Sequence, residues 1–220
     1  MQNDKLSCLI IHGFGGGVYE VKTLSDYLTG KNYIAVCTKL KGHTGCGKDM
    51  KGTNYKDWIS SAEDDLTELM KTSQNIAIIG FSMGGLIAVN LAEKYDIKAI
   101  VTINTPIYYW NIHRVFSNLL DDLKSKELIN FKRYINAKKA SPMISMLNFL
   151  KLLKITKPKL INIECPFLVL QTKDDDTTKL KSAKYIYNNI SSIDKEIILY
   201  DKGGHLVLIS DYKQNAIVEI

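Results

Sequence analysis

Six short runs rich in Ile, Val and Leu recur along the chain without clean alternation between apolar and polar residues. Runs of this length and composition are typical of strands that are buried on both faces of a parallel sheet. The pattern therefore predicts strands over about residues 6–11, 33–38, 75–80, 98–104, 166–172 and 195–200.

Segments with apolar residues at helical spacing lie between most of these runs. Val21, Leu24 and Leu28 indicate a helix that ends at Gly30, a residue type common at helix C-termini. Alternating strands and helices are typical of an open, doubly wound α/β sheet, which binds ligands at the carboxyl ends of its strands. The predicted helices cover residues 18–30, 54–71, 83–94 and 179–190.

The pentapeptide Gly80-Phe81-Ser82-Met83-Gly84 joins the third predicted strand to the helix after it. A G-x-S-x-G sequence in this context describes a nucleophile elbow, in which a strained turn presents the serine. Small residues also occur in ordinary strand-to-helix turns. We favour the nucleophile, because other loops of the chain carry matching chemistry.

Three other loops after predicted strands carry that chemistry. The first strand leads into a glycine-rich loop over 12–17, the fifth into acidic residues over 174–176, and the sixth into Gly203-Gly204-His205. The order glycine-rich loop, serine, acid, histidine is the chain order of the α/β-hydrolase triad. At these motifs the chain resembles the α/β-hydrolase superfamily, and more narrowly the small bacterial carboxylesterases and related monoacylglycerol lipases.

The resemblance covers nearly the whole chain and is densest at residues 6–45, 75–106 and 165–208. It implies an α/β-hydrolase fold with a mostly parallel sheet of about six strands and a small helical cap. The antiparallel strands that usually open this fold are missing, because few residues precede Leu6. The chain reaches Ile220 about ten residues into its last predicted helix, so we expect either a trimmed chain or a partner over one sheet face.

A serine hydroxyl needs a base within hydrogen-bond reach, and the base needs an orienting acid. The resemblance implies Ser82 as nucleophile and His205 as base, since His205 matches the family's Gly-His after the last strand. His12, His43 and His113 are the other histidines, and shaping, turn and packing roles are expected for them. Counting from Thr172 in the family's pattern gives Asp175 as the acid, and a shift of one residue would give Asp174.

Acyl transfer also needs two N–H donors that stabilise the developing oxyanion. The family pattern implies the backbone amides of Phe14 and Met83 for this role. A glycine-rich loop after a strand can instead hold phosphate, but no G-x-G-x-x-G or G-K-[ST] sequence follows. The implied mechanism needs neither a metal nor an organic cofactor.

The segment 106–160 interrupts the strand–helix alternation, and by resemblance it is the cap, with 1–105 and 161–220 forming the core. Tyr108, Tyr109 and Trp110 lie at its start and are predicted to bind substrate. Apolar residues at helical spacing follow. For each Met or aromatic residue taken singly we favour packing of the cap on the core, whereas together they would form the apolar underside that an acyl-binding cap requires. Those that we expect on the underside above Ser82 include Met143, Met146, Leu147 and Leu150.

Charge is concentrated in the same segment. The chain has a net charge of +6, and residues 106–160 hold eleven Lys and Arg against three Asp and Glu. We interpret this as a solvated lysine-rich surface. The alternative is a basic lid that makes transient contact with an anionic membrane surface or an acidic partner. No nucleic-acid-binding motif accompanies the charge.

Length and composition limit the cell-biological interpretation. A chain of 220 residues with 45% apolar content can form one domain, and no window is long and apolar enough to cross a bilayer. The first strand begins too early for a signal peptide, which predicts a cytoplasmic protein. The four cysteines show no C-x-x-C spacing, so we expect free thiols at Cys8, Cys37, Cys46 and Cys165.

The function predicted from these residues is hydrolysis of short- to medium-chain acyl esters or monoglycerides through an acyl-enzyme on Ser82. Two alternatives keep the triad and change the substrate, to a thioester or to a carbon–carbon bond. A third is a catalytically silent binding module, since fold does not fix function. The sequence leaves the oligomeric state open.

Overall fold

A computed structural model of the chain describes residues 6–108 and 142–220. In these residues six strands form one sheet in the order β2-β1-β3-β4-β5-β6, and every neighbouring pair is parallel. The predicted parallel sheet of about six strands is thereby confirmed. The strands are β1 (Ser7–Ile11), β2 (Ile34–Thr38), β3 (Ile76–Phe81), β4 (Ala99–Ile103), β5 (Phe167–Thr172) and β6 (Lys195–Tyr200).

Helices follow most of the strands, and four of the α-helices match predicted ones closely. The predicted helix over 18–30 is a short 3-10 turn followed by α1. The α-helices are α1 (Lys22–Gly30), α2 (Gly47–Lys51), α3 (Tyr55–Met70), α4 (Met83–Ala92), α7 (Met143–Thr156), α8 (Lys181–Asn189) and α9 (Lys213–Ile217). The 3-10 turns are η1 (Val18–Glu20), η2 (Lys157–Asn162) and η3 (Val207–Ile209).

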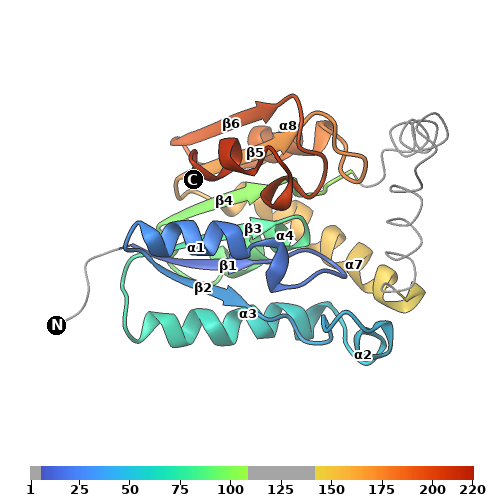
Figure 1. Cartoon of the computed structure of the whole chain (residues 1–220). Helices are drawn as coiled ribbons and strands as arrows, with labels where there is room; N and C mark the ends of the chain where they lie inside the picture. Colours follow the sequence, from blue (N-terminus) through green and yellow to red (C-terminus); the bar gives the residue numbers. More distant parts are fainter. Residues whose placement is uncertain (1–5, 109–141) are drawn as a thin grey trace.

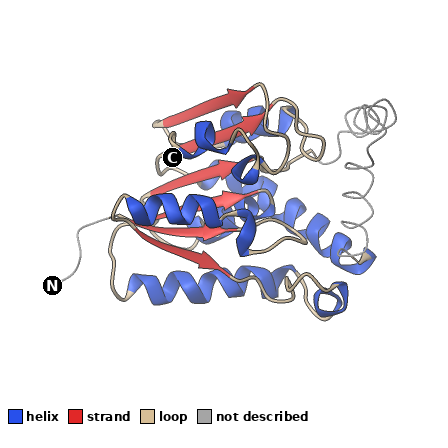
Figure 2. Ribbon diagram, in the orientation of Figure 1, coloured by secondary structure: helices blue, strands red, loops and turns tan. Residues whose placement is uncertain are grey.

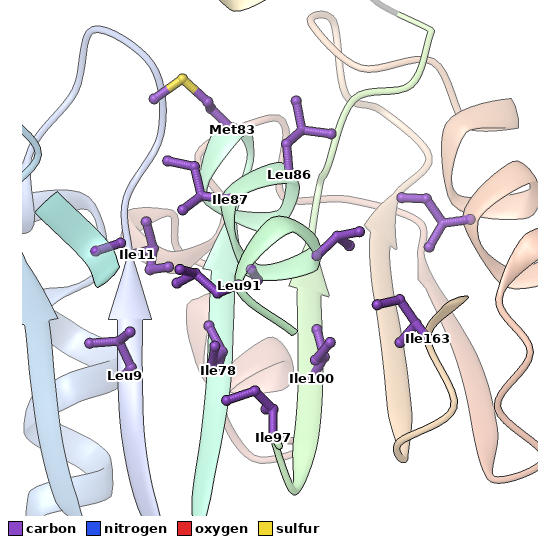
Figure 3. Close-up of a cluster of buried hydrophobic side chains, with 14 of the residues drawn as sticks. Leu9, Ile11, Ile78, Met83, Leu86, Ile87, Leu91, Ile97, Ile100 and Ile163 are labelled. Carbon is purple, nitrogen blue, oxygen red and sulfur yellow. The ribbon is translucent and has the colours of Figure 1, made fainter. Parts of the chain in front are cut away.

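Both faces of the sheet are covered by helices (Figure 2). Consecutive strand residues point to opposite faces, so Leu9 and Ile10 of β1 belong to different core clusters. The larger cluster joins the sheet to α3, α4, α7 and α8, and part of it is drawn in Figure 3. The smaller cluster joins the other face to α1, η3 and α9. This two-sided burial is why the central strands β1, β3, β4 and β5 are largely apolar, whereas the edge strands β2 and β6 are only partly buried.

The strand order fixes where a site can form. From β1 the chain moves to β2 on one side, and it returns to β3 on the other side of β1. A crevice opens at the carboxyl ends of two strands where the connections diverge in this way. Because every neighbouring pair is parallel, the carboxyl ends of the strands lie along one edge of the sheet, as the arrows in Figure 1 indicate. The glycine-rich loop after β1 and the elbow after β3 therefore meet at the switch point.

Helix α7 covers the sheet with a face that its hydrophobic pattern does not reveal. Phe149 and Leu152 lie in the larger core cluster, whereas Met143 is 82% exposed and Leu147 is 50% exposed. The apolar stripe expected under a cap therefore points largely outward on this helix. Residues 109–141 lie outside the described part of the chain, so the division into core and cap stays a prediction.

Three further observations concern the chain as a whole. In the described residues, no helix is both long enough and apolar enough to cross a membrane. All four cysteines are free thiols. The short last helix, α9, buries Ala216 and Ile217 against the smaller core cluster.

Candidate active site

Ser82 stands at the junction of β3 and α4 in a conformation that few residues adopt. Its backbone angles are φ 52° and ψ −119°, and Ser82 is 6% exposed to solvent. Close packing on both sides holds this strained turn in place. A Cβ on Gly80 would lie 2.3 Å from the Gly85 nitrogen, and a Cβ on Gly84 would lie 2.1 Å from the Ile11 carbonyl oxygen. Glycine at both flanking positions is therefore a steric requirement.

The structure brings Ser82, His205 and Asp175 together in one hydrogen-bonded chain. The Ser82 Oγ lies 3.0 Å from His205 Nε2, and His205 Nδ1 lies 2.8 Å from Asp175 Oδ2. Because the carboxylate can only accept, the network places the imidazole proton on Nδ1 and leaves the Nε2 lone pair facing the serine hydroxyl. This tautomer is the one that a general base needs.

Asp175 is held by its own loop as well as by the histidine. Its Oδ1 accepts from the backbone N–H of Thr177 at 2.7 Å and of Thr178 at 2.8 Å. Its Oδ2 also accepts from Gln171 Nε2 at 3.2 Å. The side chain is 1% exposed, so these donors stabilise a charge that is removed from solvent.

Asp174, the alternative acid, has a different position. Its carboxylate accepts from the backbone N–H groups of Gly203 at 3.2 Å and Gly204 at 2.8 Å. These two glycines precede His205, and both have positive φ angles. Asp174 thus holds the loop that carries the histidine, while Asp175 contacts the imidazole.

The loop after β1, which carries the predicted oxyanion donor Phe14, lies directly against the serine. A Cβ on Gly13 would lie 3.2 Å from the Ser82 Cβ, and Phe14 is the next residue. Met83 is the first residue of α4, and the first N–H groups of a helix have no intrahelical partner. The positive end of the helix dipole therefore points to the region between Ser82 and this loop.

Glu20 is a residue of the site that the sequence analysis missed. Its Oε2 accepts from the Gly13 N–H at 3.0 Å, and the residue is 7% exposed. Burial raises the pKa of the Glu20 carboxyl to about 7, although the Gly13 hydrogen bond and the nearby His205 oppose the shift. A Cβ on Gly16 would lie 2.1 Å from this carboxyl group, so the glycine leaves room for it. No sequence motif marks an acid in this place.

Two other histidines stabilise the same region without joining the hydrogen-bonded chain. The His12 Nδ1–H donates to the Gly13 carbonyl at 2.9 Å, and its Nε2 accepts from the Leu40 N–H at 3.4 Å. Burial lowers the pKa values of both His12 and His43 to about 4. Both rings are therefore neutral at pH 7. The His43 ring also packs against Phe14 with a centroid separation of 6.1 Å.

Tyr108 is the one predicted substrate-binding residue of the cap that lies in the described part of the chain. The Tyr108 ring packs edge-on against Tyr185 at 5.7 Å, and Lys157 and Lys181 lie over it at 4.8 and 3.9 Å. These contacts tie the residue to η2 and α8. Outside the described part of the chain lie Tyr109, Trp110 and His113.

Comparison with known proteins places these features in context. A model of the family described as "Serine aminopeptidase, S33" (Hydrolase_4) matches residues 2–211. A thermostable monoacylglycerol lipase of Bacillus sp. (strain H-257) is 30% identical over 229 residues, covering 99% of this chain and 89% of the lipase. A carboxylesterase of Bacillus subtilis (strain 168) is 24% identical over 208 residues, covering 91% of this chain and 85% of the esterase.

Solved structures share the fold at lower identity. One structure, from work on the metagenome-derived lipolytic enzymes LipS and LipT, matches with a TM-score of 0.82 and 18% identity over 99% of this chain and 92% of its own. A monoacylglycerol lipase of Paleococcus ferrophilus matches with a TM-score of 0.73 and 14% identity, over 98% of this chain and 94% of its own.

Proposed function

We propose that this chain, which belongs to the Hydrolase_4 family (described as serine aminopeptidase, S33), is a serine carboxylic ester hydrolase with Ser82 as its nucleophile. The observation that carries the proposal is the hydrogen-bonded chain from Ser82 through His205 to Asp175 at a strained elbow. The names of the lipase and carboxylesterase relatives support an ester substrate. The substrates proposed are short- to medium-chain acyl esters or monoglycerides.

In the proposed mechanism, His205 Nε2 accepts the Ser82 proton as the serine oxygen attacks the ester carbonyl. Asp175 stabilises the imidazolium that forms, since its carboxylate is already oriented toward Nδ1. The N–H groups of Phe14 and Met83 stabilise the oxyanion, each worth about 3 kcal/mol by precedent. His205 then protonates the leaving alcohol, and water hydrolyses the acyl-enzyme by the same steps.

The family description supports one other candidate, the cleavage of an amide bond at the N-terminus of a peptide. The same triad would serve, with His205 protonating an amine instead of an alcohol. The esterase proposal is preferred because the lipase relative aligns with 99% of this chain.

The test is hydrolysis of p-nitrophenyl esters from acetate to palmitate, and of monoacylglycerols, by wild type and Ser82→Ala. Loss of a triad serine costs up to about 10⁶ in kcat, so the variant should show only background turnover. Ser60→Ala is the matched control, because Ser60 is an exposed serine on α3. Ester turnover that survives in Ser82→Ala would refute the proposal. Faster turnover of aminoacyl p-nitroanilides or thioesters than of esters would change the substrate class.

A further inference from the structure

Asn104 follows β4 in a conformation that needs a specific reason. The residue is fully buried, and its φ angle of 49° lies in the left-handed region. Asparagine tolerates this region better than most residues, but it still costs backbone energy. Strained, buried polar residues near a candidate site often serve its geometry.

The Asn104 carboxamide joins the loop of the triad histidine to the end of β5. Its Nδ2 donates to the Gly204 carbonyl at 3.0 Å and to the His205 carbonyl at 2.8 Å. Its Oδ1 accepts from the Thr172 N–H at 2.9 Å. Two donors therefore face the histidine loop, and the acceptor faces the strand that leads to the acid.

The backbone of Asn104 makes further connections to the acid side of the site. Its N–H donates to the Leu170 carbonyl of β5 at 2.9 Å, and its carbonyl accepts from the Thr178 hydroxyl at 3.1 Å. The N–H of Thr178 in turn binds Asp175 Oδ1. One residue thus contacts both the loop of the acid and the loop of the base.

The histidine loop depends on such contacts. Gly203 and Gly204 have φ angles of 137° and 62°, which lie outside those of regular secondary structure. Besides the Asp174 carboxylate on their N–H groups, the Thr172 hydroxyl holds the Gly204 carbonyl at 2.7 Å. The His205 carbonyl is bound by Asn104, directly at the residue whose ring must reach Ser82.

We propose that Asn104 is a positioning residue for catalysis, which sets the orientation of the His205 imidazole toward Ser82 by holding the carbonyls of Gly204 and His205. The proposal rests on the proposed hydrolase function. It requires an amide at this position, because a carboxylate of the same shape would direct an oxygen at two carbonyl oxygens. An error of about 1 Å in such a group can cost 10²-fold in rate.

The first test compares Asn104→Gly and Asn104→Asp with wild type on p-nitrophenyl acetate. Glycine removes the carboxamide without backbone strain. Aspartate keeps the shape of the side chain but replaces the donating NH₂ group with an oxygen that can only accept. We expect kcat to fall by about 10- to 100-fold in both, with KM changed less than about threefold. Asn90→Ala is the matched control, since Asn90 is also a buried, hydrogen-bonded asparagine, on α4. Its kcat should stay close to that of wild type.

A double-mutant cycle separates positioning from general structural damage. In the His205→Ala background no imidazole remains to be oriented, so Asn104→Gly should have no further effect on residual turnover. An equal loss in both backgrounds, or an unchanged kcat in Asn104→Gly, would overturn the proposal. Should the Asn104 variants fail to fold, Thr172→Val loosens the same Gly204 carbonyl, and it should lower kcat several-fold in the wild-type background only.

A second measurement needs no ester substrate. The His205 Nδ1 proton shared with Asp175 should give a low-field ¹H NMR signal in ¹⁵N-labelled wild type that is absent in His205→Ala. We expect this signal to shift or disappear in Asn104→Gly and to persist in Asn90→Ala. A shift in a protein that hydrolyses no ester would refute the proposed function and support the positioning role. An unchanged signal would count against the positioning role alone.

Discussion

Single residues decide how the loop after β1 is held against Ser82. The Gly13 N–H is bound by a buried carboxyl group, and His205 and Tyr19 are the titratable groups that interact with it. Burial raises the pKa of Glu20 from an ordinary 4.5 to about 7. The folded protein therefore retains the Glu20 proton at pH values where the unfolded chain has lost it.

The raised pKa of Glu20 makes the free energy of unfolding depend on pH. Between about pH 4.5 and 7 the folded state binds more protons at Glu20, so this residue lowers the free energy of unfolding as pH rises. Glu20→Gln keeps an oxygen for the Gly13 N–H but cannot ionise. We expect the free energy of unfolding of the variant, relative to that of wild type, to increase by up to about 3 kcal/mol as the pH rises from 4.5 to 7.5, measured by urea unfolding. A difference that stays constant with pH would contradict this prediction.

Only some residues of the candidate site can be recognised from sequence motifs. The triad candidates occur in recognisable motifs after strands, and the structure brings Ser82, Asp175 and His205 into hydrogen-bond contact. Glu20 and Asn104 carry no motif, since their importance depends on which backbone groups the fold brings to them. Sequence reasoning finds the groups that react, but it does not find the residues that hold them.

At the scale of elements, the central strands were predicted closely because burial on both faces leaves an unambiguous apolar run. Helix α7 shows where the same reasoning fails. Its buried face includes Asn148 and Thr156, which satisfy their polar groups on the helix's own carbonyls of Ile144 and Leu152. A face that contains such residues looks polar in the sequence, and the exposed stripe looks like the core.

The contact between α4 and β1 gives a prediction at this scale. A Cβ on Gly84 would lie 2.1 Å from the Ile11 carbonyl oxygen, and a backbone atom cannot move aside as a side chain can. Gly84→Ala should therefore push the start of α4 away from the loop after β1. We expect a loss of about 1–3 kcal/mol in unfolding free energy and a fall in kcat, measured by urea unfolding and ester hydrolysis.

Gly30→Ala is the matched control for that substitution. Gly30 ends α1, and a Cβ there would have no atom within 4 Å. Because alanine lowers the entropy of the unfolded chain, this variant should be unchanged or up to about 1 kcal/mol more stable, with full activity. Equal effects of the two substitutions would show that the close approach of α4 to β1 is unimportant.

At the scale of the whole molecule, strand order is the feature that hydrophobic patterning could not predict. Alternating strands and helices predict a parallel sheet, but they do not say that β1 lies between β2 and β3. That order places the loop after β1 beside the elbow after β3, and these are the two segments that carry the proposed oxyanion donors. Hydrophobic periodicity is local, whereas strand order depends on contacts between distant segments.

Three buried titratable groups together set how the stability of the whole fold depends on pH. Burial lowers the pKa values of His12 and His43 from 6.5 to about 4, so the folded state binds fewer protons than the unfolded chain between pH 4 and 6.5. Each histidine therefore raises the free energy of unfolding as pH rises through this window, by up to about 3 kcal/mol. Glu20 opposes them with the reverse sign, which leaves a net rise of about 1.4 kcal/mol per pH unit where all three act.

The histidine contribution can be isolated with His43→Gln, in which one of the two neutral rings is replaced by a group that does not titrate. The stability of wild type should rise relative to this variant between pH 4 and 6.5, and the two urea-unfolding curves should then stay parallel above pH 7. Parallel behaviour over the whole range would mean that His43 titrates as in the unfolded chain. The aromatic packing around Phe14 would then be open to water, and the loop after β1 would lack the rigid support that a preorganised oxyanion site requires.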